Sequence, residues 1–236
     1  MSFLLEILTN FFDLLHNGVQ LVFAEPSLSW GMTIILFTVI VKLLLLPLTI
    51  KQFRATSKMT EIQPKMKQLQ DKYKNDPNRA QQEMMKLYKE HNVSPFSGCL
   101  PLLIQFPILI ALFNVFNKLD LTGVGFSLLP WITDLSAPDP LKILPILSAL
   151  TTFISTKLMQ PATGEAAAQT KTMNIVMTVM ILFMSFKFSA ALVLYWTVSN
   201  VFQLVQSLVM NKIKAKNAVD NEATKNMQKD KKPNKA

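Results

Sequence analysis

The chain has 236 residues, of which 50% are hydrophobic, and a formal net charge of +9 at pH 7. Several apolar runs are long enough to cross a bilayer, so the composition is typical of a membrane protein and excludes an ordinary soluble globule. Cys99 is the single cysteine, and the two histidines, His16 and His91, lack neighbouring ligands at metal-binding spacing. We therefore expect no disulfide framework, no metal and no cofactor.

Residues 1–29 place apolar side chains at helical spacing, with polar residues between them, until Glu25-Pro26 breaks the pattern. The stretch has neither the basic start nor the small-residue cleavage site of a secretory signal peptide. It predicts an extracytoplasmic amphipathic helix that lies in the membrane interface.

Residues 30–50 form the first predicted span, with Lys42 near its middle and Trp30 as an anchor at its start. An ammonium group at the bilayer midplane costs from roughly 2.5 to above 10 kcal/mol. The nearer end of the span is about 12 Å away, which is further than the lysine stem reaches. Either Lys42 lines a water-holding cavity, or it lies near the end of a span whose limits differ from 30–50.

Residues 51–98 carry ten Lys or Arg against five Asp or Glu and have no membrane-length apolar run. Their apolar residues follow a heptad-like seam, interrupted by the turn signal Asn75-Asp76-Pro77. The predicted seam consists of Met59, Ile62, Met66, Leu69, Tyr73, Met84, Leu87 and His91. This pattern predicts a cytoplasmic helical hairpin, with a kink at Pro64.

Four further spans are predicted, at 99–116, 141–158, 173–188 and 190–210, joined by an extracytoplasmic loop at 117–140 and a cytoplasmic loop at 159–172. The last two spans almost touch and predict a tight hairpin. The tail, 211–236, has eight lysines against three acidic residues and is expected to be disordered. Five spans place all the basic segments on one side, which the positive-inside rule identifies as the cytoplasm, with the N-terminus outside.

Polar side chains share helix faces within these spans. They are Thr38 and Thr49 with Lys42, Gln105 and Asn114 in the second span, Ser148, Thr152, Ser155 and Thr156 in the third, and Trp196, Ser199, Asn200, Gln203 and Gln206 in the fifth. Each stripe alone is explained by hydrogen bonds between membrane helices. Together with a central lysine, they favour a shared hydrated groove. No nucleophile–base pair or nucleotide-binding motif is present, so we expect no catalytic residues and no enzyme activity.

Three segments resemble the YidC/Oxa/Alb family of membrane-protein insertases: KLLLLPLTIKQ at 42–52, HNVSPFSGCLPLLIQFPILIALF at 91–113 and LYWTVSN at 194–200. The resemblance covers essentially the whole chain and keeps the order of its elements. It implies an all-α, multi-pass protein of the bacterial plasma membrane, whose five helices enclose a hydrophilic groove open to the cytoplasm and lipid but closed outside. The expected form is the Gram-positive-like one, without a large outer-face domain.

The resemblance also implies that a cation on the first core helix attracts the acidic or polar flank of a client. Many members have arginine there, and Lys42 keeps the charge but not the bidentate fork. The predicted client-binding groove contains Lys42, Thr38, Gln105, Thr152, Ser155, Trp196, Ser199, Asn200 and Gln203.

The expected function is insertion and folding of client membrane proteins, independently of or together with a Sec translocon. The expected partners are the clients, anionic lipids, and the ribosome through the tail and hairpin, without base-specific readout of nucleic acid. The alternatives are an anion-selective channel or small-solute transporter, and a membrane assembly factor that translocates nothing.

Overall fold

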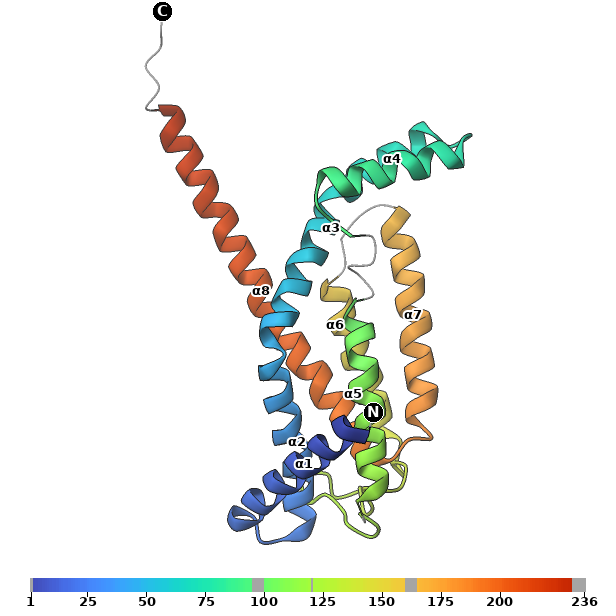
Figure 1. The fold of residues 1–236 in the computed structure, drawn as a ribbon, viewed down its shortest axis with the longest axis vertical. Helices are drawn as coiled ribbons and strands as arrows, with labels where there is room; N and C mark the ends of the chain where they lie inside the picture. The colour runs from blue at the N-terminus through green and yellow to red at the C-terminus, as the bar shows by residue number, and fades with distance from the viewer. Residues whose placement is uncertain (1, 95–99, 120, 160–164, 231–236) are drawn as a thin grey trace, which may run out of the picture.

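The structure is a computed structural model that describes residues 2–94, 100–119, 121–159 and 165–230. These residues form helices and no strand, which confirms the predicted all-α class (Figure 1). The helices are α1 (Ser2–Val22), α2 (Pro26–Leu44), α3 (Leu46–Lys72), α4 (Pro77–Glu90), α5 (Leu100–Lys118), α6 (Ile143–Met159), α7 (Glu165–Ser185) and α8 (Ala190–Asp230). Cys99, the predicted start of the second span, lies outside the described residues, as do 231–236.

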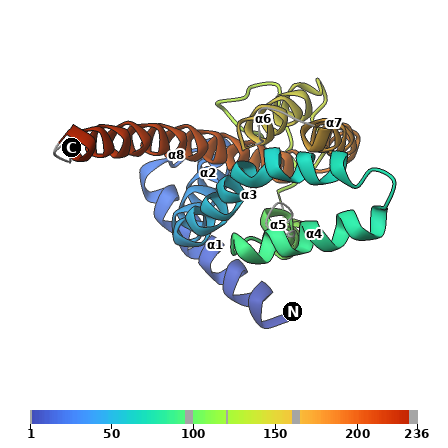
Figure 2. The same ribbon diagram turned by 90° about the horizontal axis from the view of Figure 1, so that it is seen from above.

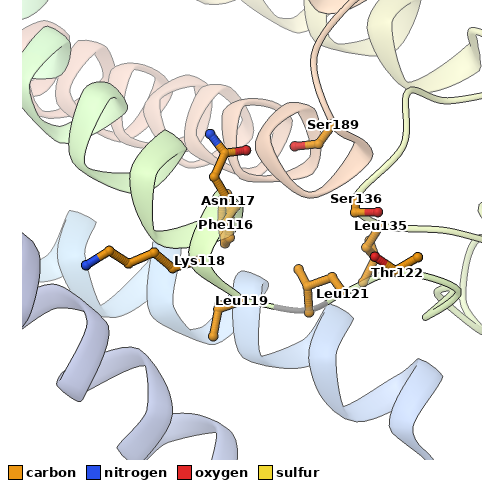
Figure 3. A pocket seen from close by; sticks show the side chains of 9 residues that line it. All are labelled: Phe116, Asn117, Lys118, Leu119, Leu121, Thr122, Leu135, Ser136 and Ser189. Atoms are coloured by element: carbon orange, nitrogen blue, oxygen red, sulfur yellow. The ribbon is translucent and has the colours of Figure 1, made fainter.

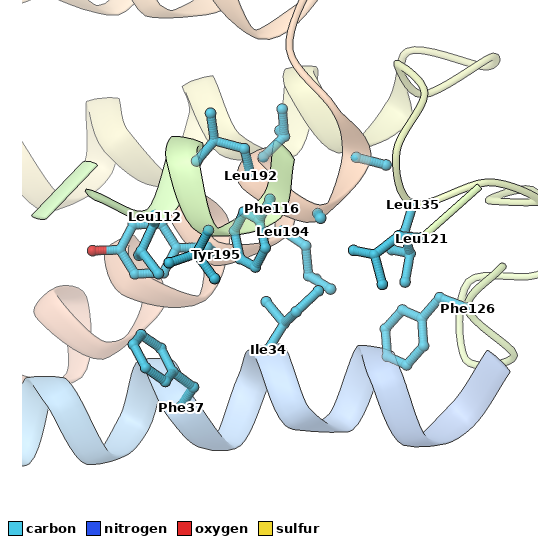
Figure 4. Close-up of a cluster of buried hydrophobic side chains, with 14 of the residues drawn as sticks. Ile34, Phe37, Leu112, Phe116, Leu121, Phe126, Leu135, Leu192, Leu194 and Tyr195 are labelled. Atoms are coloured by element: carbon cyan, nitrogen blue, oxygen red, sulfur yellow. The ribbon is translucent and has the colours of Figure 1, made fainter. Parts of the chain in front are cut away.

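The largest hydrophobic core joins α2, α5 and α8 with the loop that follows α5 (Figure 4). Ile34 and Phe37 of α2 and Leu112 of α5 pack with Tyr195 of α8, and all four are almost fully buried. In a bilayer, close packing of this kind holds helices together, since lipid tails are as apolar as the side chains themselves.

The N-terminal helix α1 lies across one end of the bundle and packs against α2 and α5 (Figure 1). Its inner face buries Phe12 and His16, and the His16 ring stacks on Trp30 with 3.5 Å between ring centroids. Trp30 is therefore partly covered by α1, and its role as an anchor at the membrane surface stays a prediction. Ile7 and Leu14 remain exposed on another face of α1.

The predicted span 30–50 is divided at Leu45, where α2 gives way to α3. Pro47 explains the division, because it has no N–H to continue the helical hydrogen-bond ladder. The break is short, since Leu45 N still donates to Val41 O at 3.0 Å. Lys42 consequently lies in the last turn of α2 and not at the middle of one helix. The helix limits thus differ from 30–50, although the apolar run continues into α3.

Helices α3 and α4 pack against each other as the predicted hairpin, through a cluster separate from the main core. Its buried members are Ile62, Met66, Leu87 and Val93, with Met59, Leu69, Met84 and Tyr88 packed around them. Two residues of the predicted seam, Tyr73 and His91, lie outside this cluster. Arg79 lies over the ring of Tyr73, and His91 Nε2 lies 3.2 Å from Lys65 Nζ. Pro64 lies inside α3, which continues through it.

Replacing Ile62 and Leu69 by Asp should open the hairpin without unfolding the bundle, because the two clusters share no residues. Burying an unpaired carboxylate costs several kcal/mol, and about 1.4 kcal/mol already corresponds to a tenfold change in an equilibrium. Amide exchange in α3 and α4 should therefore rise at least about tenfold. The control is Met85→Asp, since Met85 is exposed on α4. Equal protection of α4 in both variants would contradict this assignment.

The loop between α5 and α6 closes one end of the bundle by capping two helices. The carbonyl oxygens of Leu135 and Ala137 accept hydrogen bonds from the first two N–H groups of α8 at 3.0 and 2.8 Å. Asp139 Oδ2 accepts from the N–H of Leu144 in α6 at 2.6 Å. These contacts satisfy backbone donors that a helix start leaves unpaired.

The same loop packs closely against the start of α2. A Cβ atom at Gly31 would lie 2.0 Å from Cδ2 of Phe126, so glycine alone leaves room for this ring. Beside it, the Glu25 carboxylate accepts hydrogen bonds from Ser27 at 2.6 Å and from Ser127 at 2.9 Å. These bonds lower the pKa of Glu25, which therefore remains ionised at neutral pH.

Helix α6 packs against both α7 and α8. The predicted span 173–188 corresponds to α7, which begins earlier, at Glu165, and ends earlier, at Ser185. Only residues 186–189 connect α7 to α8, which agrees with the short connection predicted for the last two spans. However, α7 and α8 each pack mainly against α6 and not against each other.

Helix α8 continues to Asp230, in contrast to the disordered tail predicted from residue 211. Residues 211–230 contain no glycine or proline and include five lysines and three alanines, which favour a helix. A helix already nucleated in the bundle extends through such a sequence without a second nucleation step. An ion pair of 3.0 Å between Lys214 and Glu61 also ties the extension to α3.

Two described helices are long and apolar enough to cross a membrane, Pro26–Leu44 and Ala190–Asn217. Shorter apolar helices span Ile143–Leu158 and Asn174–Ser185. The five-span count predicted from the sequence therefore stays a prediction.

Candidate functional site

Lys42 is held by a hydrogen-bond network that crosses three helices. Its Nζ donates to Oε1 of Gln105 in α5 at 3.2 Å. The Gln105 amide in turn donates to the hydroxyl of Tyr195 in α8 at 2.7 Å. We call Lys42, Gln105 and Tyr195 the lysine network. It joins the predicted cation, Lys42, to Gln105, one of the two polar residues predicted in the second span.

The charge of Lys42 meets a neutral carboxamide in this network. Neither of the two ion pairs among the described residues involves Lys42. An ammonium group has three donors, so the contact with Gln105 leaves donors for a further acceptor. A half-buried cation with a neutral partner is suited to attract an anionic group from outside the chain.

A second network connects α6 and α8. Thr152 Oγ1 accepts hydrogen bonds from Trp196 Nε1 at 3.4 Å and from Asn200 Nδ2 at 2.6 Å. The Asn200 amide also lies 3.5 Å from the carbonyl oxygen of Ser148. Trp196 and Asn200 of α8 thus both donate to Thr152 of α6, as expected of polar residues that join membrane helices.

The remaining predicted site residues are not part of the two networks described above. Thr38 is fully buried, and its hydroxyl donates to Ile34 O of its own helix at 2.6 Å. The Ser155 hydroxyl likewise donates within α6, to Thr152 O at 3.2 Å. Ser199 is buried on α8, and Gln203 is half-buried one turn further along. The structure therefore brings Lys42 to Gln105, but Thr38 turns its hydroxyl back to its own helix.

Tyr195 was not among the predicted site residues, although it lies in the quoted segment 194–200. A signal was present in the sequence, because a tyrosine buried among apolar residues normally needs a partner for its hydroxyl. Gln105 is that partner. A further contact joins the two predicted polar faces, since Gln206 Nε2 donates to Thr49 Oγ1 at 2.7 Å.

A cavity of about 270 Å³ lies at the loop end of the bundle, between α5, the loop and the start of α8 (Figure 3). Lys118 is the one cation among its nine lining residues, and its ammonium points away from Ser136 and Ser189 (Figure 3). None of the predicted site residues lines this cavity. It is therefore separate from the lysine network.

The described residues contain no group of three His, Cys, Asp or Glu side chains that could hold a metal ion. The chemistry available around Lys42 is accordingly that of one cation, carboxamides and hydroxyl groups, which suits binding of polar or anionic groups.

Comparison with known proteins identifies the family. The family model described as "60Kd inner membrane protein" matches residues 22–218. A Clostridium tetani protein named "Membrane protein insertase YidC" is 44% identical over 225 residues, which cover 94% of this chain and 100% of the relative. The chain belongs to the YidC family.

Other YidC proteins agree with this assignment. The YidC of Clostridium perfringens is 49% identical over 88% of this chain and 91% of its own length. A solved structure described as "Active YidC insertase crystal structure with the first transmembrane domain resolved" matches with a TM-score of 0.68 at 30% identity. That match covers 86% of this chain and 45% of the solved chain, so this chain spans less than half of that YidC. These findings confirm the resemblance recognised in the sequence.

Proposed function

We propose that this chain, a YidC-family membrane protein insertase, takes the polar flank of a client into a hydrophilic groove beside Lys42. The observation that carries this mechanism is that the half-buried Lys42 has the neutral Gln105 as the hydrogen-bond partner of its ammonium group. When an acidic or polar flank leaves water, contacts with the lysine network replace part of the hydration that the flank loses. The chain is a binding and transfer device in this proposal, with no catalytic residue.

The apolar segment of the client moves into lipid at the same time, and the gain on transfer from water is roughly 25 cal/mol per Å² of apolar surface. Helix α7 offers a surface for this step, because Val176, Met180 and Phe183 are exposed along one face. The membrane potential assists an acidic flank moving outward by roughly 2.3 kcal/mol per charge per 100 mV. No nucleotide is required.

The proposed topology has five spans in the bacterial plasma membrane, with the hairpin and the end of α8 in the cytoplasm. The hairpin and this end of α8 lie at the same end of the molecule, opposite α1 and the capping loop (Figure 1). The hairpin and tail are also the most basic segments, which agrees with the positive-inside rule. The N-terminus is then outside, with α1 in the outer interface.

Reconstitution into protein-free liposomes tests the proposal. A single-span client with a short acidic flank should become protected from added protease only when the chain is present. Anion flux without insertion would instead support a channel, and client binding without protection would support an assembly factor. Insertion in these liposomes would also show that a Sec translocon is not obligatory.

Deleting residues 212–236 should weaken co-sedimentation with ribosomes. The segment has eight lysines against three acidic residues, so its attraction to RNA is electrostatic and should fall as salt rises. Insertion of short clients that have already left the ribosome should change little. Equal ribosome binding of both forms at low salt would instead assign docking to the hairpin. Anionic lipids are the proposed competing surface, at about 1 kcal/mol per basic residue.

A further inference from the structure

The segments that the proposed topology places on the outer side of the membrane contain three lysines against six acidic residues. These lysines are Lys118, Lys142 and Lys187. The positive-inside rule predicts few cations on this side. Two of the three come together, because the Lys142 ammonium group lies over the ring of Phe186, 5.7 Å from its centroid, and Lys187 directly follows Phe186 in the chain.

Acidic side chains within the described part of the chain do not neutralise this pair of lysines. Both lysines are exposed, and neither belongs to the two ion pairs that the described residues form. The acidic residue nearest to Lys142 in the sequence is Asp139, and its carboxylate accepts hydrogen bonds from the backbone N–H groups of Leu141 and Leu144. Two like charges repel each other. An anion that contacts both lysines would therefore remove this repulsion.

Lys142 occupies its position against two local preferences. Its φ is +58°, in the left-handed region that disfavours residues with a Cβ atom. It also directly precedes Ile143, the first residue of α6, and the partial positive charge of a helix start disfavours a cation there. Residues that break local rules are expected at functional or strained sites. An anionic partner would offset the second of these costs.

Exposed apolar side chains continue from the two lysines along α6 and α7. Ile143 and Ile146 are exposed on α6, and Val179 and Phe183 are exposed on α7. The Phe183 ring meets the Phe186 ring edge-on, with 6.4 Å between centroids. Helices α6 and α7 pack together on the side of the bundle away from α1, which therefore leaves this surface open (Figure 2). Two cations at the end of an apolar surface match an amphiphile that has an anionic headgroup and acyl chains.

We propose that Lys142, Phe186 and Lys187 form a binding site for an anionic phospholipid of the outer leaflet, whose acyl chains lie along the exposed faces of α6 and α7. The phosphate accepts hydrogen bonds from both ammonium groups, and Phe186 holds Lys142 in place by a cation–π contact. Lys142 precedes α6 and Lys187 lies between α7 and α8, so one lipid ties the outer ends of these helices together. The site is separate from the basic tail and does not depend on how clients are inserted.

Native mass spectrometry of the full-length protein in detergent tests the site. The probes are phosphatidylglycerol and phosphatidylcholine with the same acyl chains, so only the headgroup differs. One basic residue near an anionic surface raises affinity about fivefold, so Lys142→Gln with Lys187→Gln should weaken phosphatidylglycerol binding by roughly tenfold or more. The matched control is Lys67→Gln with Lys89→Gln, which removes the same charge from exposed positions of α3 and α4 and should bind as the parent does.

Thermal unfolding gives a second readout, because a ligand that binds only the folded state raises the midpoint. Phosphatidylglycerol should raise the midpoint of the parent and of the control more than phosphatidylcholine does, and this difference should at least halve in the Lys142 and Lys187 variant. Lys142→Arg with Lys187→Arg should keep the difference, since both charges remain. Equal lipid binding by the variant and the control, whether retained or lost in both, would overturn the site. Displacement of the lipid by an equal concentration of inorganic phosphate would also overturn it, because an ion site needs no acyl chains.

Discussion

Lys42→Ala should reduce the initial rate of insertion of clients with an acidic flank by about tenfold to a hundredfold. A hydrogen bond to a charged group contributes about 1.5–3 kcal/mol, and about 1.4 kcal/mol corresponds to a factor of ten. Lys42→Arg should retain most of the rate, because the positive charge is kept. The rate is measured by protease protection in proteoliposomes.

Two controls separate the charge of Lys42 from a structural role. A client whose acidic residues are replaced by Asn should insert at a similar rate with Lys42→Ala and with the parent. Lys51→Ala removes a charge from an exposed position of α3 and should change neither client. Equal losses for the acidic and the neutral client would show that Lys42 supports the fold and does not recognise the flank.

Gly31→Ala should destabilise the protein, because the new Cβ would lie 2.0 Å from the ring of Phe126. Phe126 is buried in the main core and has little room to move. Overpacking of this kind costs about 1–3 kcal/mol and outweighs the gain of up to about 1 kcal/mol in helix propensity. The midpoint of thermal unfolding in detergent should fall by about 2–4 °C per kcal/mol of net loss.

Gly18→Ala is the matched control for this prediction. Gly18 is also inside a helix, but nothing lies within 4 Å of a Cβ atom there, so the substitution should be neutral or stabilising. Combining Gly31→Ala with Phe126→Ala should cost less than the sum of the two single changes, because the second removes the clash of the first. Equal stability of the Gly31 and Gly18 variants would contradict the close fit of loop and helix.

The hairpin of α3 and α4 shows what the hydrophobic periodicity of the sequence can predict. The seam through Met59, Ile62 and Met66 follows a heptad spacing, which determines the helix face that is buried. The turn at Asn75-Asp76-Pro77 determines where the chain reverses, and Asp76 caps α4 by accepting from Arg79 N at 3.0 Å. Helices and their buried faces were therefore predictable here, because both depend on neighbours within a few turns.

Helix ends were less predictable, because they depend on what the rest of the protein provides. Pro47 divides the first apolar run, and this local signal was available in the sequence. The helical extension of α8 through 211–230 was missed because charge composition indicated disorder, whereas a helix nucleated in the bundle extends through a suitable sequence.

The sequence by itself determined the all-α class, the polar helix faces, the unusual cation at Lys42 and the segments that resemble the YidC family. Tertiary structure alone decided which polar groups meet: Lys42 contacts Gln105, 63 residues away, and Gln105 contacts Tyr195, 90 residues further along. It also decided that Thr38 bonds within its own helix. The physical reason is that periodicity defines the face of a helix, whereas rotation and depth relative to other helices are set by close packing over the whole bundle.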